Sequence, residues 1–195
     1  MSRQIEFYYD YGSPAAYLAW TQMPALAVRA GAELVRRPIL LGGVFKATGN
    51  RSPMSIAAKG AWMTRDLARF AERYGVPFAI NSNFIVNTLA IMRGALVAAN
   101  GGVLERYDDA MFHAMWVAGR DMSDPAAIAA VLSAAGLDVE TYRAGIQDDA
   151  IKQALIAATT DAVDRGVFGT PSFFVDDELF FGQDRLDFVE AALGD

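Results

Sequence analysis

Ile5-Glu6-Phe7-Tyr8-Tyr9-Asp10-Tyr11-Gly12-Ser13-Pro14-Ala15-Ala16-Tyr17-Leu18 begins as an apolar strand and turns sharply into a helix. Gly12 allows the backbone angles of a tight turn, Ser13 is a residue type that caps helices, and Pro14 suits the first helical position. The stretch therefore predicts a hydroxyl at a helix N-terminus, where the partial positive charge stabilises an anion. Ser13 is either the cap of its own helix or a functional hydroxyl, and the local pattern leaves both readings open.

A distant stretch, Gly166-Val167-Phe168-Gly169-Thr170-Pro171-Ser172-Phe173-Phe174-Val175, has the order helix end, loop, proline and buried strand. Asp176-Asp177 then predicts a turn, residues 178–181 a second strand, and Gly182-Gln183-Asp184-Arg185 the start of a final helix. A strand and helix at the beginning, combined with this order at the end, is the plan of a thioredoxin fold. In that fold the proline is cis and faces the N-terminus of the first helix.

The segment between these two stretches is predicted to contain one more strand and then only helices. Residues 33–37 first form a second strand, parallel to the opening one, because the helix between them has the length of a crossover connection. We expect an α/β protein with a thioredoxin-like fold formed by residues 1–40 and 166–195. A large all-helical domain, residues 41–165, is inserted between the βαβ unit and the C-terminal ββα unit. Apolar stripes predict helices over 55–74, 85–100, 104–115, 125–136, 139–147 and 149–165.

The composition limits the class of ligand. The chain has 195 residues, 53% of them hydrophobic, and a formal net charge of -6. Lys and Arg do not cluster, which argues against a nucleic acid or an anionic membrane as partner. A signal peptide or an 18-residue apolar run is not visible, so we expect a soluble, cytoplasmic protein that binds a small molecule.

The chain contains no cysteine and a single histidine, His113. Disulfide exchange requires a thiolate, so the protein cannot carry out that reaction by itself. A Cys/His zinc site is excluded because there is no cysteine and only one histidine, and we predict no metal centre. His113 lies among apolar residues in the sequence, which favours a structural imidazole outside the site.

Several segments resemble the 2-hydroxychromene-2-carboxylate isomerase family, which is grouped with kappa-class glutathione transferases and DsbA-like thioredoxin-fold proteins. The similarity runs over essentially the whole chain. Its most specific pieces are Ser13-Pro14 with Tyr17-Leu18, and the block from Phe168-Gly169 to Asp184-Arg185. Gly49-Asn50 and Lys59-Gly60 add to it.

This resemblance implies a glutathione-dependent isomerase that interconverts a hydroxychromene carboxylate and a trans-benzylidenepyruvate in the breakdown of aromatic compounds. It also implies glutathione as cofactor, a small aromatic keto acid as substrate, and a homodimer. Ser13 is the implied catalytic residue, as a hydroxyl that donates to the glutathione sulfur and not as the nucleophile. The implied glutathione-binding residues are Asn50, Lys59, Thr170, Pro171, Gln183 and Asp184.

The residue types suit this ligand. Thr170, before the proline, is expected to have its backbone N–H and C=O free to pair with the cysteinyl part of glutathione. Asp184, beside Gln183, suits the γ-glutamyl ammonium, whereas Lys59 and Asn50 suit the glycyl carboxylate. Each side chain also has a structural reading. Lys59 can be a solvated lysine, Asn50 a turn residue and Asp184 a helix N-cap.

The substrate and the reaction outcome stay open at this point. Ala15 and Ala16 stand where the family more usually has an aromatic and a small polar residue, which predicts a wider pocket mouth. A kappa-like glutathione transferase that releases a conjugate is one alternative, and a non-catalytic, cysteine-free binding protein is another. The helical insertion is expected to supply an apolar wall from Phe45, Trp62, Phe84 and Trp116.

Overall fold

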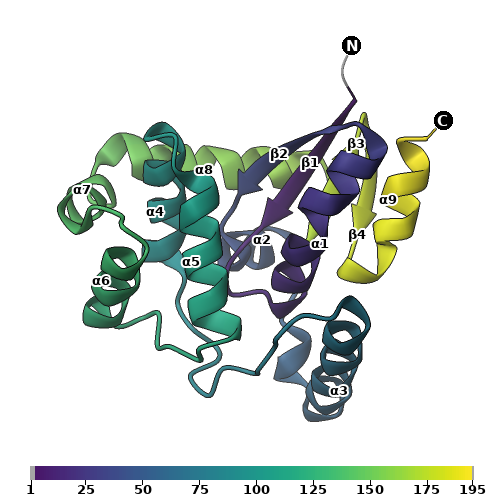
Figure 1. Ribbon diagram of the computed structural model, residues 1–195, viewed down its shortest axis with the longest axis horizontal. Coiled ribbons are helices and arrows are strands. Elements are labelled where there is room, and N and C mark those ends of the chain that lie inside the picture. Colours follow the sequence, from purple (N-terminus) through teal and green to yellow (C-terminus); the bar gives the residue numbers. More distant parts are fainter. Residues whose placement is uncertain (1–2, 195) are drawn as a thin grey trace.

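The protein is described by a computed structural model that covers residues 3–194. Four strands form one sheet in the order β2-β1-β3-β4 (Figure 1). β1 pairs with β2 in parallel, whereas β3 is antiparallel to both β1 and β4. This order and these directions confirm the predicted thioredoxin-like fold. The strands are β1 Gln4–Tyr9, β2 Glu33–Pro38, β3 Ser172–Val175 and β4 Glu178–Phe181.

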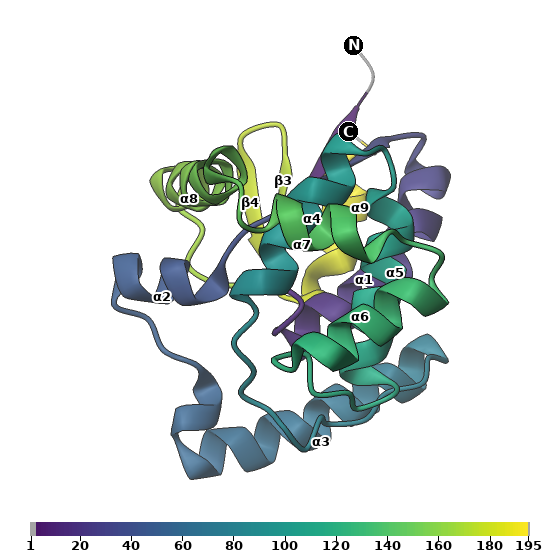
Figure 2. The ribbon, with the colours of Figure 1, turned by 90° about the vertical axis from the view of Figure 1, so that its left-hand side faces the viewer.

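The regular elements between β2 and β3 are all helical, as predicted for this part of the chain. α3 lies at the end of the molecule opposite the start of β1 and the end of α9 (Figures 1 and 2). No helix within residues 3–194 is long and apolar enough to cross a membrane. The α-helices are α1 Pro14–Ala30, α2 Leu41–Thr48, α3 Ala57–Tyr74, α4 Leu89–Asn100, α5 Leu104–Trp116, α6 Pro125–Ala134, α7 Val139–Gly145, α8 Asp149–Asp164 and α9 Leu186–Ala192, with short 3-10 turns η1 Pro53–Ser55 and η2 Gln183–Arg185.

Both faces of β1 are buried, because its side chains alternate between two apolar layers. Phe7 and Tyr9 point to the layer that contains α1, α5 and α9, where Phe7 stacks on Phe173 of β3. Tyr8 points to the opposite layer and packs with Phe174. A strand that is apolar on both faces has to be central, which is the position of β1 in the sheet.

The inserted helices share this core with the thioredoxin elements. Leu18 and Met23 of α1 belong to one continuous cluster with Met111 and Phe112 of α5. On the other face of the sheet, Ala162 of α8 packs in the layer of Tyr8. α8 therefore packs against one face of the sheet. The division into two domains at residues 40/41 and 165/166 stays a prediction.

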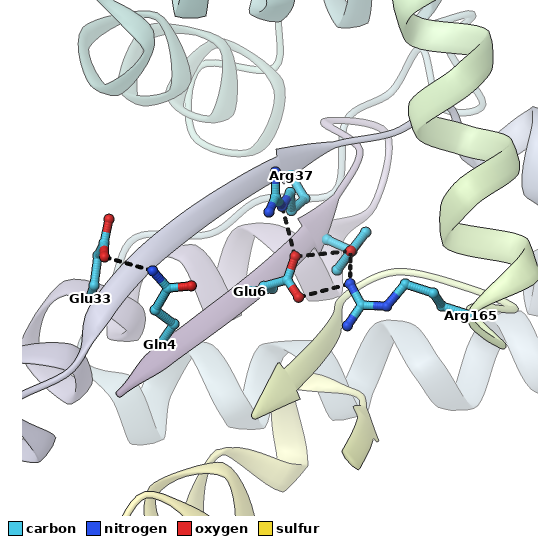
Figure 3. Close-up of polar contacts among 6 residues, drawn as sticks. Gln4, Glu6, Glu33, Arg37 and Arg165 are labelled. Atoms are coloured by element: carbon cyan, nitrogen blue, oxygen red, sulfur yellow. Dashed lines mark hydrogen bonds and ion pairs between the residues drawn. The ribbon is translucent and has the colours of Figure 1, made fainter. Parts of the chain in front are cut away.

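An ion-pair network covers the outer part of β1. Glu6 accepts from Arg165, which follows α8, at 2.7 Å and from Arg37 of β2 at 2.8 Å (Figure 3). Burial by itself raises the pKa of Glu6, but the two guanidinium groups outweigh it and the pKa lies below its ordinary value. The network thus ties the end of α8 to the two parallel strands.

Two details of the helix prediction were wrong. The stripe that begins at Ile85 was predicted as helix, but α4 begins only at Leu89, and Ile85 is 69% exposed. Ile85 lines a cavity instead. Its distance of four residues from Leu89 matched the spacing of a helical stripe, although Ile85 lies outside the helix. Ile56 is likewise half exposed, at the N-cap of α3, and does not belong to the core. The short helix α2 was not predicted as a separate element.

A buried carboxylate joins β1 to the inserted helices. Asp108 of α5 is inaccessible to solvent and accepts from the hydroxyls of Tyr9 at 2.7 Å and Tyr11 at 2.5 Å. The guanidinium of Arg36 lies 3.7 Å away. Burial raises the pKa of Asp108 to about 7, even though the tyrosine hydroxyls and Arg36 pull it down.

Asp108→Asn is expected to change how stability depends on pH. The folded protein holds the Asp108 proton more tightly than the unfolded chain, so ionisation weakens folding as pH rises from about 4 to about 7. Relative to the asparagine variant, the free energy of unfolding of the wild type should therefore fall over this window. At about 1.4 kcal/mol per pKa unit the loss approaches roughly 4 kcal/mol. Urea unfolding of both proteins across the window measures it, and parallel pH profiles would contradict it.

Candidate active site

Ser13 lies where the end of β1 turns into α1. Its Oγ accepts from the Ala16 N–H at 3.1 Å, so the predicted helix cap is present. The same hydroxyl donates to the carbonyl oxygen of Thr170 at 2.9 Å, across 157 residues of sequence. Ser13 is thus both a cap and the contact between the first helix and the proline loop.

The Thr170–Pro171 peptide bond is cis, as predicted, and the loop faces the N-terminus of α1. The expectation that both backbone groups of Thr170 are free was wrong for the carbonyl, which accepts from Ser13. Within residues 3–194 the Thr170 N–H has no acceptor. Its Oγ1 is also buried without a hydrogen-bond partner in this described part of the chain.

A cavity of about 480 Å³ opens beside these residues. Its volume lies in the range usual for small-molecule sites. Part of its wall is formed by Ser13 and Ala15 at the start of α1 and by Thr170 and Pro171 of the proline loop. The predicted wall residues Phe45 of α2, Trp62 of α3 and Phe84 also line it.

Trp116 was wrongly predicted as part of this wall. It is completely buried, does not line the cavity, and its indole Nε1 donates to the backbone oxygen of Tyr11 at 2.8 Å. Ala16 is also buried in the core, so only Ala15 bears on the width of the pocket mouth. His113 is exposed on α5 and not packed as a structural imidazole, and it lies outside the cavity wall.

Besides Thr170 and Pro171, three more of the predicted glutathione-binding residues line the cavity, namely Asn50, Gln183 and Asp184. Asn50 is held in place by its Nδ2, which donates to the Phe168 oxygen at 2.9 Å. The structural reading of Asp184 as an N-cap was wrong, because α9 begins at Leu186 without a side-chain cap. The carboxylate of Asp184 pairs with Arg185 at 2.6 Å instead. Lys59 is exposed on α3 and does not belong to the cavity wall.

Asp10 is a cavity residue that the sequence analysis missed. It is 1% exposed, and its carboxylate accepts from the N–H groups of Gly12 and Leu41 at 2.8 Å and from the Thr88 hydroxyl at 3.1 Å. Burial raises the pKa of Asp10, although these three donors oppose the rise. The only signal in the sequence was a carboxylate at the end of an apolar strand. It ties the turn before Ser13 to the starts of α2 and α4.

Comparison with known proteins places this arrangement in a family. The model of the DsbA-like thioredoxin domain matches residues 4–194. A 2-hydroxychromene-2-carboxylate isomerase of Sphingobium xenophagum is 35% identical, over the whole length of both chains. The chain belongs to this family of DsbA-like proteins.

Two further relatives agree with this membership. Human glutathione S-transferase kappa 1 is 27% identical over 100% of the chain and 92% of its own length. A solved structure of 2-hydroxychromene-2-carboxylate isomerase superposes with a TM-score of 0.89 at 28% identity, covering 98% of this chain and 94% of the other. The relatives are isomerases and glutathione transferases, which supports an enzyme.

The described residues hold no group of three or more His, Asp or Glu side chains arranged to bind a metal ion. The polar groups that face the cavity are instead hydroxyl, amide, carboxylate and guanidinium groups. Such groups bind an organic ligand with several charged ends.

Thr170→Val is expected to stabilise the free protein. The buried Oγ1 of Thr170 has no partner among residues 3–194, and replacing an unpaired hydroxyl by a methyl of the same shape removes a desolvation penalty. The free energy of unfolding should rise by about 1 kcal/mol. Denaturant unfolding measures the change, with Thr170→Ala as the control that also removes volume. A less stable valine variant would contradict the prediction.

Proposed function

We propose that the protein is a glutathione-dependent isomerase of the 2-hydroxychromene-2-carboxylate isomerase type, with glutathione as cofactor and an aromatic keto acid as substrate. The observation that carries the proposal is the 2.9 Å contact between Ser13 Oγ and the Thr170 oxygen in the wall of an apolar cavity. In a chain without cysteine, this contact supports a role for Ser13 as a hydroxyl that holds a sulfur supplied by another molecule.

The groups around the proline loop fit glutathione. The Thr170 N–H has no acceptor within the described residues, and a backbone N–H beside a cis-proline suits the extended cysteinyl segment. We assign the γ-glutamyl end to Asp184 and Gln183, and the glycyl end to Asn50 and Lys59. Lys59 would have to reach the ligand from outside the cavity wall, because its side chain does not line it. Pro171 shapes the loop against α1.

Ser13 and Thr170 are expected to exchange partners when the ligand binds. The Ser13 hydroxyl has one proton, which it now donates to the Thr170 oxygen. To donate to a sulfur it has to leave this carbonyl, which then becomes free to accept the cysteinyl N–H. One rotation of the hydroxyl about the Ser13 Cβ–Oγ bond thus satisfies both groups, and Ser13 Oγ still accepts from the Ala16 N–H.

The site favours a thiolate for two physical reasons. A hydroxyl donor and the N-terminus of α1 both stabilise negative charge at this point. A free thiol has a pKa of roughly 8.5, and each unit by which it is lowered corresponds to about 1.4 kcal/mol. When bound, glutathione would supply a thiolate that adds reversibly to a conjugated carbon of the substrate.

The remaining cavity residues would bind and enclose the substrate. Trp62 and Ile85 are more than half exposed at the rim, which is the exposure expected of apolar side chains that cover an aromatic ligand. Their closure would exclude water from the sulfur. From the family resemblance we keep the expectation of a cytoplasmic homodimer that acts in the breakdown of aromatic compounds.

Ser13→Ala should lower kcat by at least about 100-fold, because it removes a hydrogen-bond donor to the reacting charge. Glutathione should still raise the melting temperature of the variant, while the ultraviolet absorbance of its bound thiolate titrates at higher pH than in the wild type. Ser133→Ala, which removes an exposed hydroxyl from α6, is the control. Unchanged turnover in Ser13→Ala would contradict the proposed role.

A mass balance separates the candidate reactions. An isomerase leaves the amount of free glutathione unchanged after complete turnover, whereas a kappa-like transferase consumes it in proportion to product. The second outcome is kept because the kappa relative matches along the entire chain. Absence of both turnover and a thermal shift with glutathione would point to a non-catalytic binding protein.

A further inference from the structure

The cavity wall holds a single cation among the residues that the structure describes, and it is Arg51. Asn50, which precedes it, lies in the loop after α2, and Ser52, which follows, caps the short η1 turn. No motif predicted from the sequence included this arginine. Its chemistry is nevertheless the one that a cavity for an organic acid requires, since guanidinium groups bind carboxylates through two parallel hydrogen bonds.

The three carboxylates of the wall are already engaged. Asp10 accepts from three neutral donors, Asp66 of α3 pairs with Arg69 at 3.4 Å, and Asp184 pairs with Arg185 at 2.6 Å. None of the three carboxylates pairs with Arg51.

The guanidinium of Arg51, in contrast, makes no hydrogen bond or ion pair with any residue from 3 to 194. An anionic ligand therefore finds one uncommitted positive group in a wall whose other side chains are apolar, neutral polar or negatively charged.

The backbone of Arg51 is fixed although its side chain is free. Its N–H donates to Asn50 Oδ1 at 2.8 Å, and the Asn50 amide in turn donates to the oxygen of Phe168, two residues before Thr170. η1 is closed on the other side by Ser52, whose carbonyl accepts from the Ser55 N–H at 3.0 Å. The loop thus holds Arg51 at a constant place relative to the proline loop, and binding a ligand would order only the side chain.

We infer that Arg51 binds the carboxylate of the aromatic 2-oxo acid substrate and so determines the preference for acids over neutral carbonyl compounds. The inference rests on the proposed function for the substrate class. The aromatic ring then lies against the apolar wall formed by Phe45, Trp62 and Phe84, with the conjugated carbon toward Ser13. Arg51 is a binding residue in this arrangement and takes no part in proton transfer.

Calorimetric titration with benzylidenepyruvate and with its methyl ester, both without glutathione, tests the inference. The wild type should bind the acid about 10- to 100-fold more tightly than the ester, which is the usual worth of a charge-assisted hydrogen-bond pair. Arg51→Ala should lose this difference, and Arg51→Lys should keep only part of it, because an ammonium cannot form the two parallel bonds.

Lys46→Ala is the matched control, since it removes an exposed cation of α2 that does not line the cavity. It should bind the acid as the wild type does. Equal binding of acid and ester by the wild type, no binding of the acid, or an unchanged Arg51→Ala variant would each overturn the inference.

The glycyl carboxylate of glutathione offers the same chemistry to Arg51, so glutathione is titrated into the same variants. We expect the same dissociation constant for glutathione in Arg51→Ala and in the wild type. If glutathione binding weakens while acid binding is unchanged, Arg51 serves the cofactor and the inference is wrong. If the wild type does not bind glutathione but binds the acid through Arg51, the proposed function fails while this inference stands.

Discussion

The site depends on the contact between Ser13 and Thr170. A single hydrogen bond of 2.9 Å joins the helix that starts after β1 to the loop that precedes β3, and it can form only because these two strands are neighbours in the sheet. Antiparallel pairing places the end of β1 beside the beginning of β3, so the residues just beyond them, 10–13 and 169–171, meet at one edge. The Thr170 carbonyl, which precedes the cis bond to Pro171, accepts from Ser13 at this edge.

The inserted helices hold this contact from the opposite side. The Tyr11 backbone oxygen accepts from Trp116, and its hydroxyl donates to Asp108, so α5 is attached to the residue two positions before Ser13. Asp10 adds the starts of α2 and α4 through its three donors. These are buried polar groups with partners, and such groups specify one arrangement because breaking any of them leaves a polar atom unsatisfied. The insertion therefore supplies a wall for the cavity and also fixes the turn that carries Ser13.

The cavity wall contains polar groups without partners. The N–H and Oγ1 of Thr170 and the guanidinium of Arg51 are uncommitted within residues 3–194, whereas the three wall carboxylates are all paired. Polar groups that have no partner in a cavity wall are available to a ligand. A chain without cysteine can use the site for sulfur chemistry only with a thiol from another molecule, which is why glutathione is central to the proposed function.

The sequence by itself determined the thioredoxin-like fold, the cap at Ser13 and the cis-proline loop, because these depend on local backbone chemistry and on the order of elements along the chain. It also supplied Asn50, Gln183 and Asp184 as cavity residues, through resemblance to a family with the same order of motifs. Only the tertiary structure decided that Asp10 and Arg51 belong to the cavity, that Lys59 and Trp116 lie outside its wall, and that Ser13 already donates to Thr170. The physical reason is that a side chain's partners come from segments far away in sequence, and no local pattern records which of its groups they will satisfy.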